Sequence, residues 1–243
     1  MNNAEQNILL NPVSLPGVPA PITRIGTGEV RVDRAFAATT IAYDASTLIP
    51  SLSFGYRGIN GAGVVNAFKR TIAVRNLGTA ACTYEVANAF RYSDDAASGA
   101  VTVSFSPSSV NVPANGTGYV RMTVTVDGTK LPDWDAYLNG GSLGGKGEGL
   151  RKLEYDGFVT LTCGEQSVAL PWQMLPRKAA AVRPTSRQLK LIGDPGLETG
   201  TLTLKNSQGS TWPAPPKCST CWAPVRWTTL RRRLLDRTIP SRI

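Results

Sequence analysis

Two cysteines near the C-terminal end have the spacing of metal-binding or redox chemistry. Cys218 and Cys221 are separated by two residues, as in half a zinc site or a redox-active dithiol. A zinc site needs two further ligands, yet the chain contains no histidine, and its other cysteines, Cys82 and Cys163, lie far upstream. The βαβ pattern that accompanies a redox motif is absent as well. We therefore predict no metal site, no redox pair and no cofactor.

Cys82 and Cys163 allow two roles. Cys82 adjoins one expected strand and Cys163 ends another, so the pair could form a disulfide between two sheets in an oxidising compartment. The alternative is two buried free thiols that pack as small apolar side chains. A disulfide depends on the distance between the two Cα atoms, which the sequence does not give, so both roles stay open at this point.

The sequence lacks the residue combinations that common hydrolytic mechanisms need. A Ser-His-Asp triad needs an imidazole to take the serine proton, and none of the 243 residues is a histidine. Asp133 and Asp135 flank Trp134, but neighbouring loop acids usually face solvent rather than a shared substrate. The glycine-rich run 140–149 lacks the Gly-Lys-Ser/Thr ending of a phosphate-binding loop, and the sequon at 115–117 is equally a good turn. We predict no catalytic residues.

The positive charge gathers at one end of the chain. The formal net charge is +9, and the residues after 210 hold seven basic side chains against one acid, Asp236, so they carry +6 of it. The arginines at 231–233, with Trp222 and Trp227, have the residue types of a nucleic-acid patch. No recognition fold accompanies them, so we predict no specific nucleic-acid partner.

We also expect no membrane span, because no apolar run reaches ~20 residues, and no signal peptide.

Alternation of apolar and polar residues dominates the middle of the chain. The clearest case is 119–126, where Val120, Met122, Val124 and Val126 would share one face and enter a core. Similar stretches are rich in Val, Thr, Phe and Tyr and are bounded by turn residues; the expected strands are 39–43, 51–56, 68–76, 83–91, 101–105, 118–126, 157–163 and 166–173. Short strands separated by turns predict a mainly-β fold, an antiparallel β-sandwich.

Other regions flank the sandwich expected at 39–178. Residues 1–38 contain four prolines between two short helical pieces, which favours an extended connector. Residues 179–210 are predicted to be a linker and the start of a truncated second β domain, because 201–206 repeats the pattern of 71–76. Residues 211–243 lack strand alternation and are rich in Pro, Cys and Arg, which predicts a disordered, non-native tail.

The first 38 residues carry a resemblance to a known family. Gly26 and Gly28 form a Gly-x-Gly turn before a short helix of small and apolar residues, as at the close of the catalytic domain of subtilisin-like serine proteases (subtilases). Residues 1–5 are similar to the end of the helix that follows the catalytic serine in that family. The segments 68–78, 105–114, 155–159 and 170–173 resemble the fibronectin-III-like domain that follows the catalytic domain in many subtilases.

This resemblance implies a C-terminal fragment of a subtilisin-like endopeptidase that keeps an accessory β-sandwich but lacks the catalytic triad, and is itself inactive. Its partner would be the protease catalytic domain, and the sandwich would help to bind or position a protein substrate. Family members are mostly exported, which implies an extracellular or cell-surface location. Residues 1–38, a remnant of the catalytic domain, would leave Ile8, Leu9, Val30 and Phe36 poorly covered. The alternative is a stand-alone extracellular binding or adhesion module on the same fold.

Overall fold

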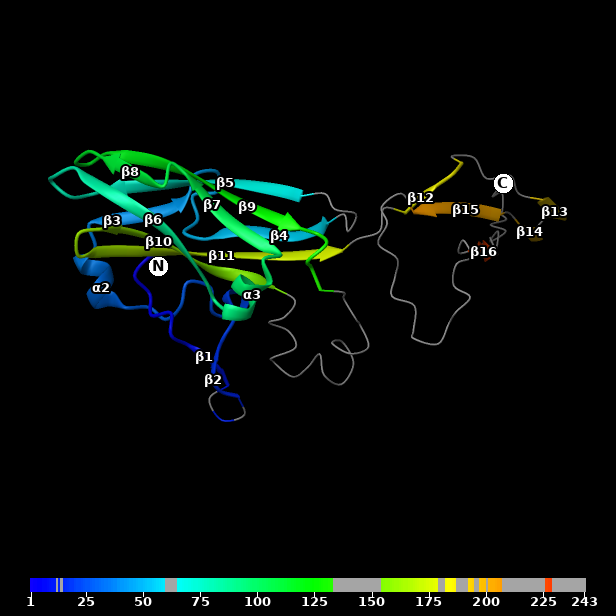
Figure 1. The fold of residues 1–243 in the computed structure, drawn as a ribbon, viewed down its shortest axis with the longest axis horizontal. Coiled ribbons are helices and arrows are strands. Elements are labelled where there is room, and N and C mark those ends of the chain that lie inside the picture. Colours follow the sequence, from blue (N-terminus) through cyan, green and yellow to red (C-terminus); the bar gives the residue numbers. More distant parts are fainter. Residues whose placement is uncertain are drawn as a thin grey trace, which may run out of the picture. The chain divides into compact units, whose positions relative to one another are not determined.

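The computed structural model describes residues 1–11, 13, 15–59, 65–132 and 154–178, with short pieces at 182–186, 192–194, 197–199, 201–206 and 226–228 (Figure 1). The chain divides into two compact units, Met1–Ala179 and Ala180–Ile243. The first unit contains both the region of the expected sandwich and the segment 1–38 that precedes it.

One layer of the first unit is a five-stranded sheet in the order β4-β11-β10-β6-β8. Its strands are β4 (Leu52–Ile59), β6 (Cys82–Phe90), β8 (Ser109–Val112), β10 (Tyr155–Cys163) and β11 (Gln166–Lys178). Neighbouring strands are antiparallel, except that β4 pairs with β11 in parallel. The central strand β10 is buried throughout its first five residues, so it does not show the alternation of a strand with one solvated face.

The second layer is a four-stranded antiparallel sheet in the order β3-β5-β9-β7. Its strands are β3 (Thr40–Asp44), β5 (Val65–Asn76), β7 (Val101–Ser106) and β9 (Thr117–Asp127). Val120, Met122, Val124 and Val126 are all fully buried, which confirms the face predicted from their alternation. The described part of the chain is therefore mainly β, and the largely antiparallel sheets of the first unit enclose an apolar core.

Trp172 lies in this core, fully buried. Its indole Nε1 donates a hydrogen bond to Asn88 Oδ1 at 2.7 Å, and its ring meets Phe90 edge-on with centroids 5.5 Å apart. Gly157 is directly opposite Trp172 in the ladder between β10 and β11. A Cβ on Gly157 would lie 2.2 Å from the carbonyl oxygen of Ala89, so only glycine lets β6 and β10 approach each other here.

Each of the eight stretches expected as strands is a strand, with ends that differ by up to five residues. Two elements of the sandwich were not predicted, β8 and the helix α3 (Ser93–Ser98). The first has only four residues. The second is built from Ser, Asp and Ala and ends at Gly99, whose φ of 59° is left-handed, so its composition is that of a turn.

The N-terminal residues form short elements of their own. They are the hairpin of β1 (Leu9–Asn11) and β2 (Leu15–Pro19), followed by the helices α1 (Ile22–Ile25) and α2 (Val32–Ala37). A helix thus follows the Gly-x-Gly turn, as predicted. Residues 1–5 are not the end of a helix: they make a single turn, in which the Ala4 amide donates to the Met1 carbonyl at 3.2 Å, because Asn2 bonds to two strands of the sandwich instead.

The second unit is described only in short strands. β12 (Val182–Pro184), β15 (Thr201–Asn206) and β16 (Arg226–Thr228) form an antiparallel sheet, and β13 (Ile192–Asp194) pairs with β14 (Leu197–Thr199). The stretch 201–206 is a strand, as its likeness to 71–76 predicted. Arg226–Thr228 falls within the tail expected to be disordered, yet it pairs with Thr201–Thr203. The remainder of 211–243 lies outside the described residues.

Candidate functional site

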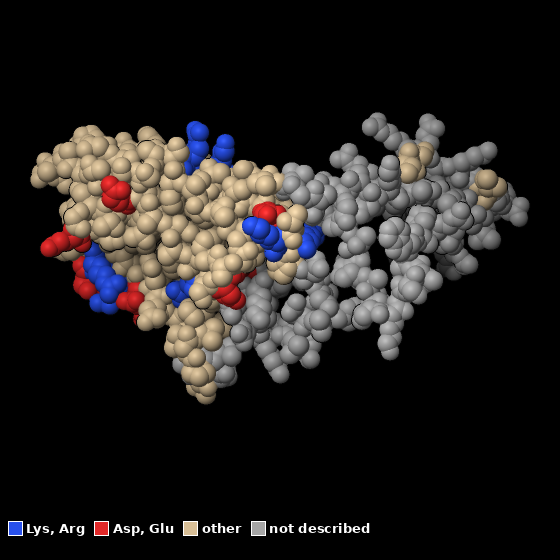
Figure 2. Space-filling model, viewed as in Figure 1, with Lys and Arg blue, Asp and Glu red and all other residues tan. Residues whose placement is uncertain are grey.

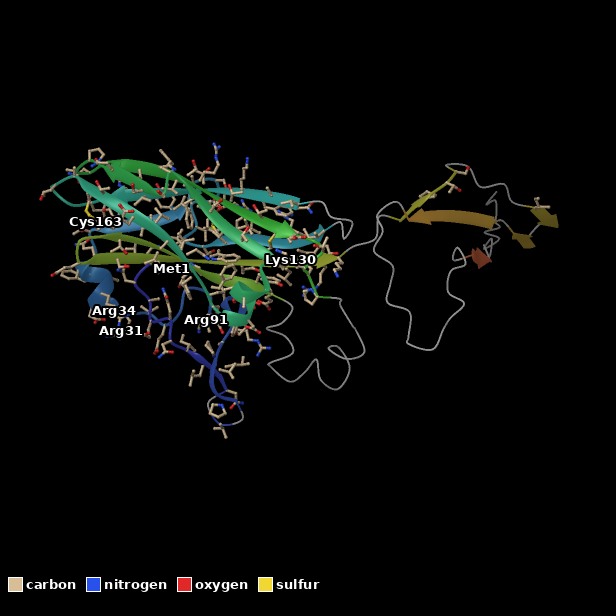
Figure 3. The ribbon with its side chains drawn as sticks, in the orientation of Figure 1. Met1, Arg31, Arg34, Arg91, Lys130 and Cys163 are labelled. Carbon is tan, nitrogen blue, oxygen red and sulfur yellow. A yellow bond between two sulfur atoms is a disulfide. The ribbon has the colours of Figure 1, made fainter. Side chains whose placement is uncertain are left out.

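Arg91 follows β6 and binds the main chain of the N-terminal segment, which we define as residues 1–31. Its guanidinium donates to the carbonyl oxygens of Ala20 (Nε, 2.9 Å), Gln6 (Nη1, 2.8 Å) and Ile8 (Nη2, 3.0 Å), and it lies 5.8 Å from the ring centre of Phe158. Figure 3 shows Arg91 close to the N-terminal part of the chain, drawn in blue. Partial burial lowers the pKa of Arg91 from its ordinary value, but a guanidinium remains protonated in proteins. One side chain thus holds three separate points of the segment.

Asn2 connects the two sheets. Its side-chain Nδ2 donates to the carbonyl oxygens of Ala42 in β3 (2.9 Å) and Ala169 in β11 (3.2 Å), while its Oδ1 accepts from the Ala42 amide at 3.2 Å. The Ala169 amide donates to the Asn2 carbonyl at 2.9 Å. Because β3 is an edge strand and β11 meets β4 only from Trp172 onward, Asn2 satisfies backbone groups that neither sheet pairs.

Two acids fix the helix α1: Asp156 in β10 and Glu154 immediately before that strand. Asp156 is fully buried, and its Oδ2 accepts a hydrogen bond from the Ile22 amide at 2.6 Å. Burial raises the pKa of the Asp156 carboxyl to about 6, with the Ile22 hydrogen bond acting in the opposite direction. Glu154 accepts from the Thr23 hydroxyl at 2.6 Å, and burial raises its pKa also. These contacts fix the start of α1 against the five-stranded sheet.

The helix α2 presents apolar side chains to solvent. Phe36 is 93% exposed, Val30 77% and Val32 73%, and no residue of α2 is buried. Leu9 is also exposed, whereas Ile8 is half-buried. The exposure predicted for this region is therefore found at Leu9, Val30 and Phe36, and only in part at Ile8. Exposed apolar side chains on a folded segment are candidates for contact with a partner.

A short β-bridge within the N-terminal segment pairs Glu5 with Glu29, just before this exposed helix. The amide of Glu5 donates to the Glu29 carbonyl at 2.8 Å, and the reverse bond is 2.9 Å. A Cβ on Gly28 would lie 2.2 Å from the Glu5 carbonyl oxygen, so the bridge requires glycine. Arg34 of α2 pairs with the Glu5 carboxylate at 3.1 Å, and a hydrogen bond from the Asn7 amide is the main cause that lowers the pKa of Glu5.

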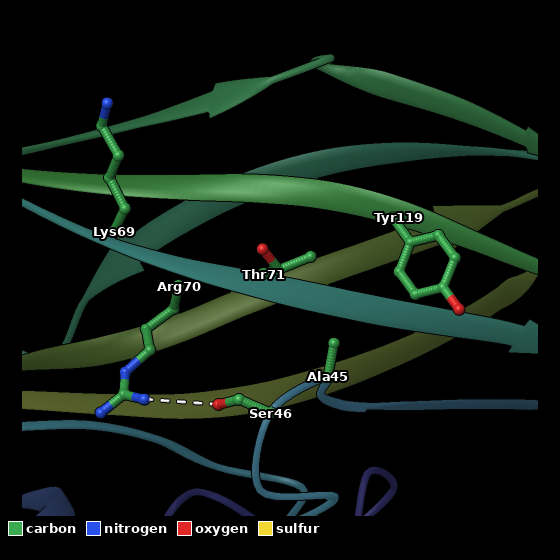
Figure 4. A pocket seen from close by; sticks show the side chains of 6 residues that line it. All are labelled: Ala45, Ser46, Lys69, Arg70, Thr71 and Tyr119. Atoms are coloured by element: carbon green, nitrogen blue, oxygen red, sulfur yellow. Dashed lines mark hydrogen bonds between the residues drawn. The ribbon is translucent and has the colours of Figure 1, made fainter.

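A shallow depression of about 400 Å³ opens at a different place, where β3 ends beside β5 (Figure 4). Ala45, Ser46, Lys69, Arg70, Thr71 and Tyr119 line it. Arg70 is engaged within the protein, since it donates to the Ser53 carbonyl at 2.8 Å and lies 3.5 Å from the buried Asp44 carboxylate. Lys69 points to the opposite side of β5. The lining offers hydroxyl groups and positive charge but no base next to a nucleophile.

Cys82 and Cys163 form a disulfide, with Cα atoms 6.2 Å apart. The bond joins the start of β6 to the end of β10, which are antiparallel neighbours in one sheet. It does not connect the two sheets, as the sequence had suggested, because the pairing of Glu85 with Thr162 brings these two strand ends together. The disulfide closes a loop across 81 residues and holds the middle of the five-stranded sheet.

Most other residues considered from the sequence do not meet in a site. Asn115 occupies the turn between β8 and β9 with a φ of 54° and donates its amide to the Gly78 carbonyl. Trp227 lies in β16 opposite Leu202. Asp133, Trp134, Asp135, the glycine-rich run 140–149, Cys218, Cys221, Trp222 and the arginines at 231–233 lie outside the described residues. Among the described residues, no group of three or more His, Cys, Asp or Glu is placed to hold a metal ion.

Sequence reasoning missed Arg91 and Asp156, which bind the N-terminal segment, and Asn2, the residue of that segment that bonds to both sheets. Only Asp156 could have been recognised from its sequence context. Asp156 stands beside Tyr155, Gly157 and Phe158 at the start of a strand without polar alternation, and an acid in such a position is buried with a partner more often than solvated. Nothing distinguishes Asn2 or Arg91 from ordinary surface residues in the sequence, because their partners lie 40 to 167 and 71 to 85 positions away.

No family model and no curated protein matches this chain. Solved structures show low-level likeness. The PapD-like domain 7 of human CEP192 is 13% identical, with a TM-score of 0.32 over 58% of this chain and 87% of that domain. The CooA pilin subunit of enterotoxigenic Escherichia coli is 9% identical, with a TM-score of 0.36 over 58% and 99%. The VesB protease of Vibrio cholerae is 13% identical, with a TM-score of 0.32 over 59% of this chain and 33% of that protein.

Within the described residues, none of the helices has the length and apolar character needed to cross a bilayer.

Proposed function

We propose that the chain is the C-terminal part of a subtilisin-like serine endopeptidase, in which a non-catalytic β-sandwich is joined through residues 1–38 to a protease catalytic domain. The observation that carries this proposal is the contrast within residues 1–38. The N-terminal segment is fixed to the sandwich by Arg91, Asn2 and Asp156, whereas Val32 and Phe36 of α2 are exposed. An apolar helix held in place but uncovered suits a surface that packs against a preceding domain.

The sandwich contributes orientation and contact area in this proposal, and no chemistry. Without histidine the chain cannot perform the proton transfers of a Ser-His-Asp triad. The catalytic domain would supply the triad. Because the N-terminal segment contacts both sheets through Asn2, the sandwich would hold that domain in one orientation and offer an adjoining surface to a protein substrate. The disulfide is of the kind found in exported proteins, which supports an extracellular or cell-surface location.

The nucleotide sequence upstream of the Met1 codon tests the proposal directly. We expect an in-phase or interrupted reading frame that encodes Asp, His and Gly-Thr-Ser motifs with the spacing of a subtilase. A secretion signal immediately upstream, with no protease coding sequence, would overturn the proposal. The stand-alone extracellular binding module would then be the better account.

The contact surface has its own test in a protein that joins the encoded catalytic domain to this chain. Phe36→Asp should lower the midpoint of thermal unfolding of the joined protein while leaving the separate chain unchanged, because Phe36 is 93% exposed in the latter. Val13→Asp is the matched control, since Val13 is 90% exposed but lies in the turn between β1 and β2. Equal effects of the two substitutions in the joined protein would show that α2 is not the contact.

A further inference from the structure

The outward face of the four-stranded sheet carries a regular set of basic and aromatic side chains. Four successive rows run across the strands on this face: Thr123 opposite Lys69, Arg121 opposite Thr71, Tyr119 opposite Ala73 and Tyr43, and Thr117 opposite Arg75 and Ile41. We call Lys69, Arg75, Arg121, Tyr43 and Tyr119 the outer face. Its cations lie in the first, second and fourth rows, and its tyrosines lie in the third.

The three cations of the outer face are exposed and have no ionic partner among the residues that the structure describes. None of their side chains makes a hydrogen bond to that described part of the protein. The nearest outward acid on these strands is Asp127, at the far end of β9, where Lys130 lies 3.8 Å from its carboxylate. Figure 2 shows basic side chains (blue) standing out from the upper edge of the first unit without acidic side chains (red) beside them. Unpaired charge on one face is free to bind an anion.

The dimensions of the outer face exclude a small ligand as the sole occupant. Side chains on one face of a strand repeat every two residues, or about 7 Å. Lys69 and Arg75 are therefore about 20 Å apart along β5, with Arg121 on the adjacent strand between them. A ligand that contacts all three cations must be extended and must carry its negative charges well separated.

The third row, which lies between cations, indicates which part of the ligand lies between its negative charges. Tyr43 and Tyr119 flank Ala73, which is only 1% exposed, while Tyr119 itself is 59% exposed. In Figure 4 the Tyr119 ring extends from β9 toward β5. Tyrosine offers an apolar ring face with a polar tip, and threonines 71, 117 and 123 add hydroxyl groups around it. A sugar ring, with an apolar face and hydroxyl groups at its rim, suits this row.

We propose that the outer face binds a linear acidic polysaccharide whose carboxylates are separated by uncharged sugar units. Charge complementarity favours this ligand over a nucleic acid. Nucleic-acid surfaces contact a dense row of phosphates with many cations and stack successive bases on aromatic rings, whereas this face has three cations and one aromatic row. The binding is a property of the sandwich alone and does not depend on the proposed protease partner.

Hyaluronate, which carries one carboxylate per disaccharide, is the probe for the test, and calorimetry on the full chain measures the binding. The native protein should bind hyaluronate and not the neutral polymer dextran, and the affinity should fall as salt rises. The double substitution Arg75→Ala and Arg121→Ala should weaken binding about tenfold, since it removes two charge contacts. The substitution Tyr119→Ala should weaken it as well.

The matched control removes two cations from other places. Arg24 and Lys130 are exposed and lie away from the outer face, so Arg24→Ala with Lys130→Ala should leave the affinity within about twofold. The basic residues after 210 are present in every variant and cannot cause a difference between them. Absence of hyaluronate binding, equal loss in both double variants, or tighter binding of oligothymidylate that depends on Arg75 and Arg121 would each overturn the proposal.

Discussion

The backbone amide of Arg91 donates a hydrogen bond to the carbonyl oxygen of Asp156 at 2.9 Å. The side chains of both residues contact the main chain of the N-terminal segment. Arg91 donates to carbonyl oxygens of residues 6, 8 and 20, and Asp156 accepts from the amide of residue 22. Arg91, just after β6, thus binds carbonyl groups of one main chain and Asp156 of β10 binds an amide of the same chain, so the N-terminal segment becomes part of the sandwich.

Replacing Arg91 with alanine should detach the N-terminal segment. The change removes three hydrogen bonds from a charged group and leaves three carbonyl oxygens without their donor, which we expect to lower the free energy of unfolding by about 2–4 kcal/mol. Urea unfolding measures this loss, and hydrogen exchange should show faster exchange within residues 1–22. Arg91→Lys should recover little, because one ammonium group does not reproduce the planar fork. The exposed Arg24→Ala is the control, with an expected change within about 0.5 kcal/mol.

Asp156→Asn should remove a pH dependence of stability. Burial raises the pKa of this carboxyl to about 6 in the folded protein, above the ordinary value of about 3.9 in the unfolded chain. The folded state therefore holds the proton more tightly, so the stabilisation is complete below about pH 4 and is lost as the pH rises through 6. Nearby Glu154 raises this pKa further, whereas Arg91 and the Ile22 amide lower it.

The measurement compares urea unfolding of the native protein and the Asp156→Asn variant between pH 4 and pH 8. Relative to the variant, the native protein should lose roughly 1–3 kcal/mol across this range. Asparagine keeps an oxygen that accepts from the Ile22 amide, so the variant should fold. A difference between the two proteins that stays constant with pH would contradict the shifted pKa of Asp156.

The sandwich could be predicted from the sequence, and the binding of the N-terminal segment could not. Alternation such as that of Val120 to Val126 is local, and it follows directly from one buried and one exposed face. The contacts of Asn2 join residues 40 and 167 positions apart, and no local pattern records them. The outer face is intermediate: its residues alternate visibly along β5 and β9, but only the strand register places Tyr43 and Tyr119 in one row.

Removing the disulfide should weaken the five-stranded sheet. Substitution of both Cys82 and Cys163 by serine frees a loop across 81 residues in the unfolded chain, and we expect a loss of about 2–4 kcal/mol of unfolding free energy. Urea unfolding with and without reductant measures it: reductant should destabilise the native protein and leave the double variant unchanged. The same substitution at Cys218 and Cys221 serves as the control. Equal sensitivity to reductant in native protein and Cys82/Cys163 variant would place the stabilising bond elsewhere.

Gly157→Ala should disrupt the centre of the same sheet. The added Cβ would lie 2.2 Å from the Ala89 carbonyl oxygen and 3.0 Å from Trp172 Nε1, so β6 and β10 must separate and the hydrogen bond from Trp172 to Asn88 must lengthen. We expect a loss of at least about 3 kcal/mol, or failure to fold, because backbone atoms of a paired ladder cannot move aside. Gly164→Ala is the matched control: Gly164 has a φ of 57° but open space around it, and its strained backbone should cost only about 1–2 kcal/mol. Urea unfolding and the near-ultraviolet signal of Trp172 distinguish the two, and equal losses would mean that the close approach at Gly157 is not required.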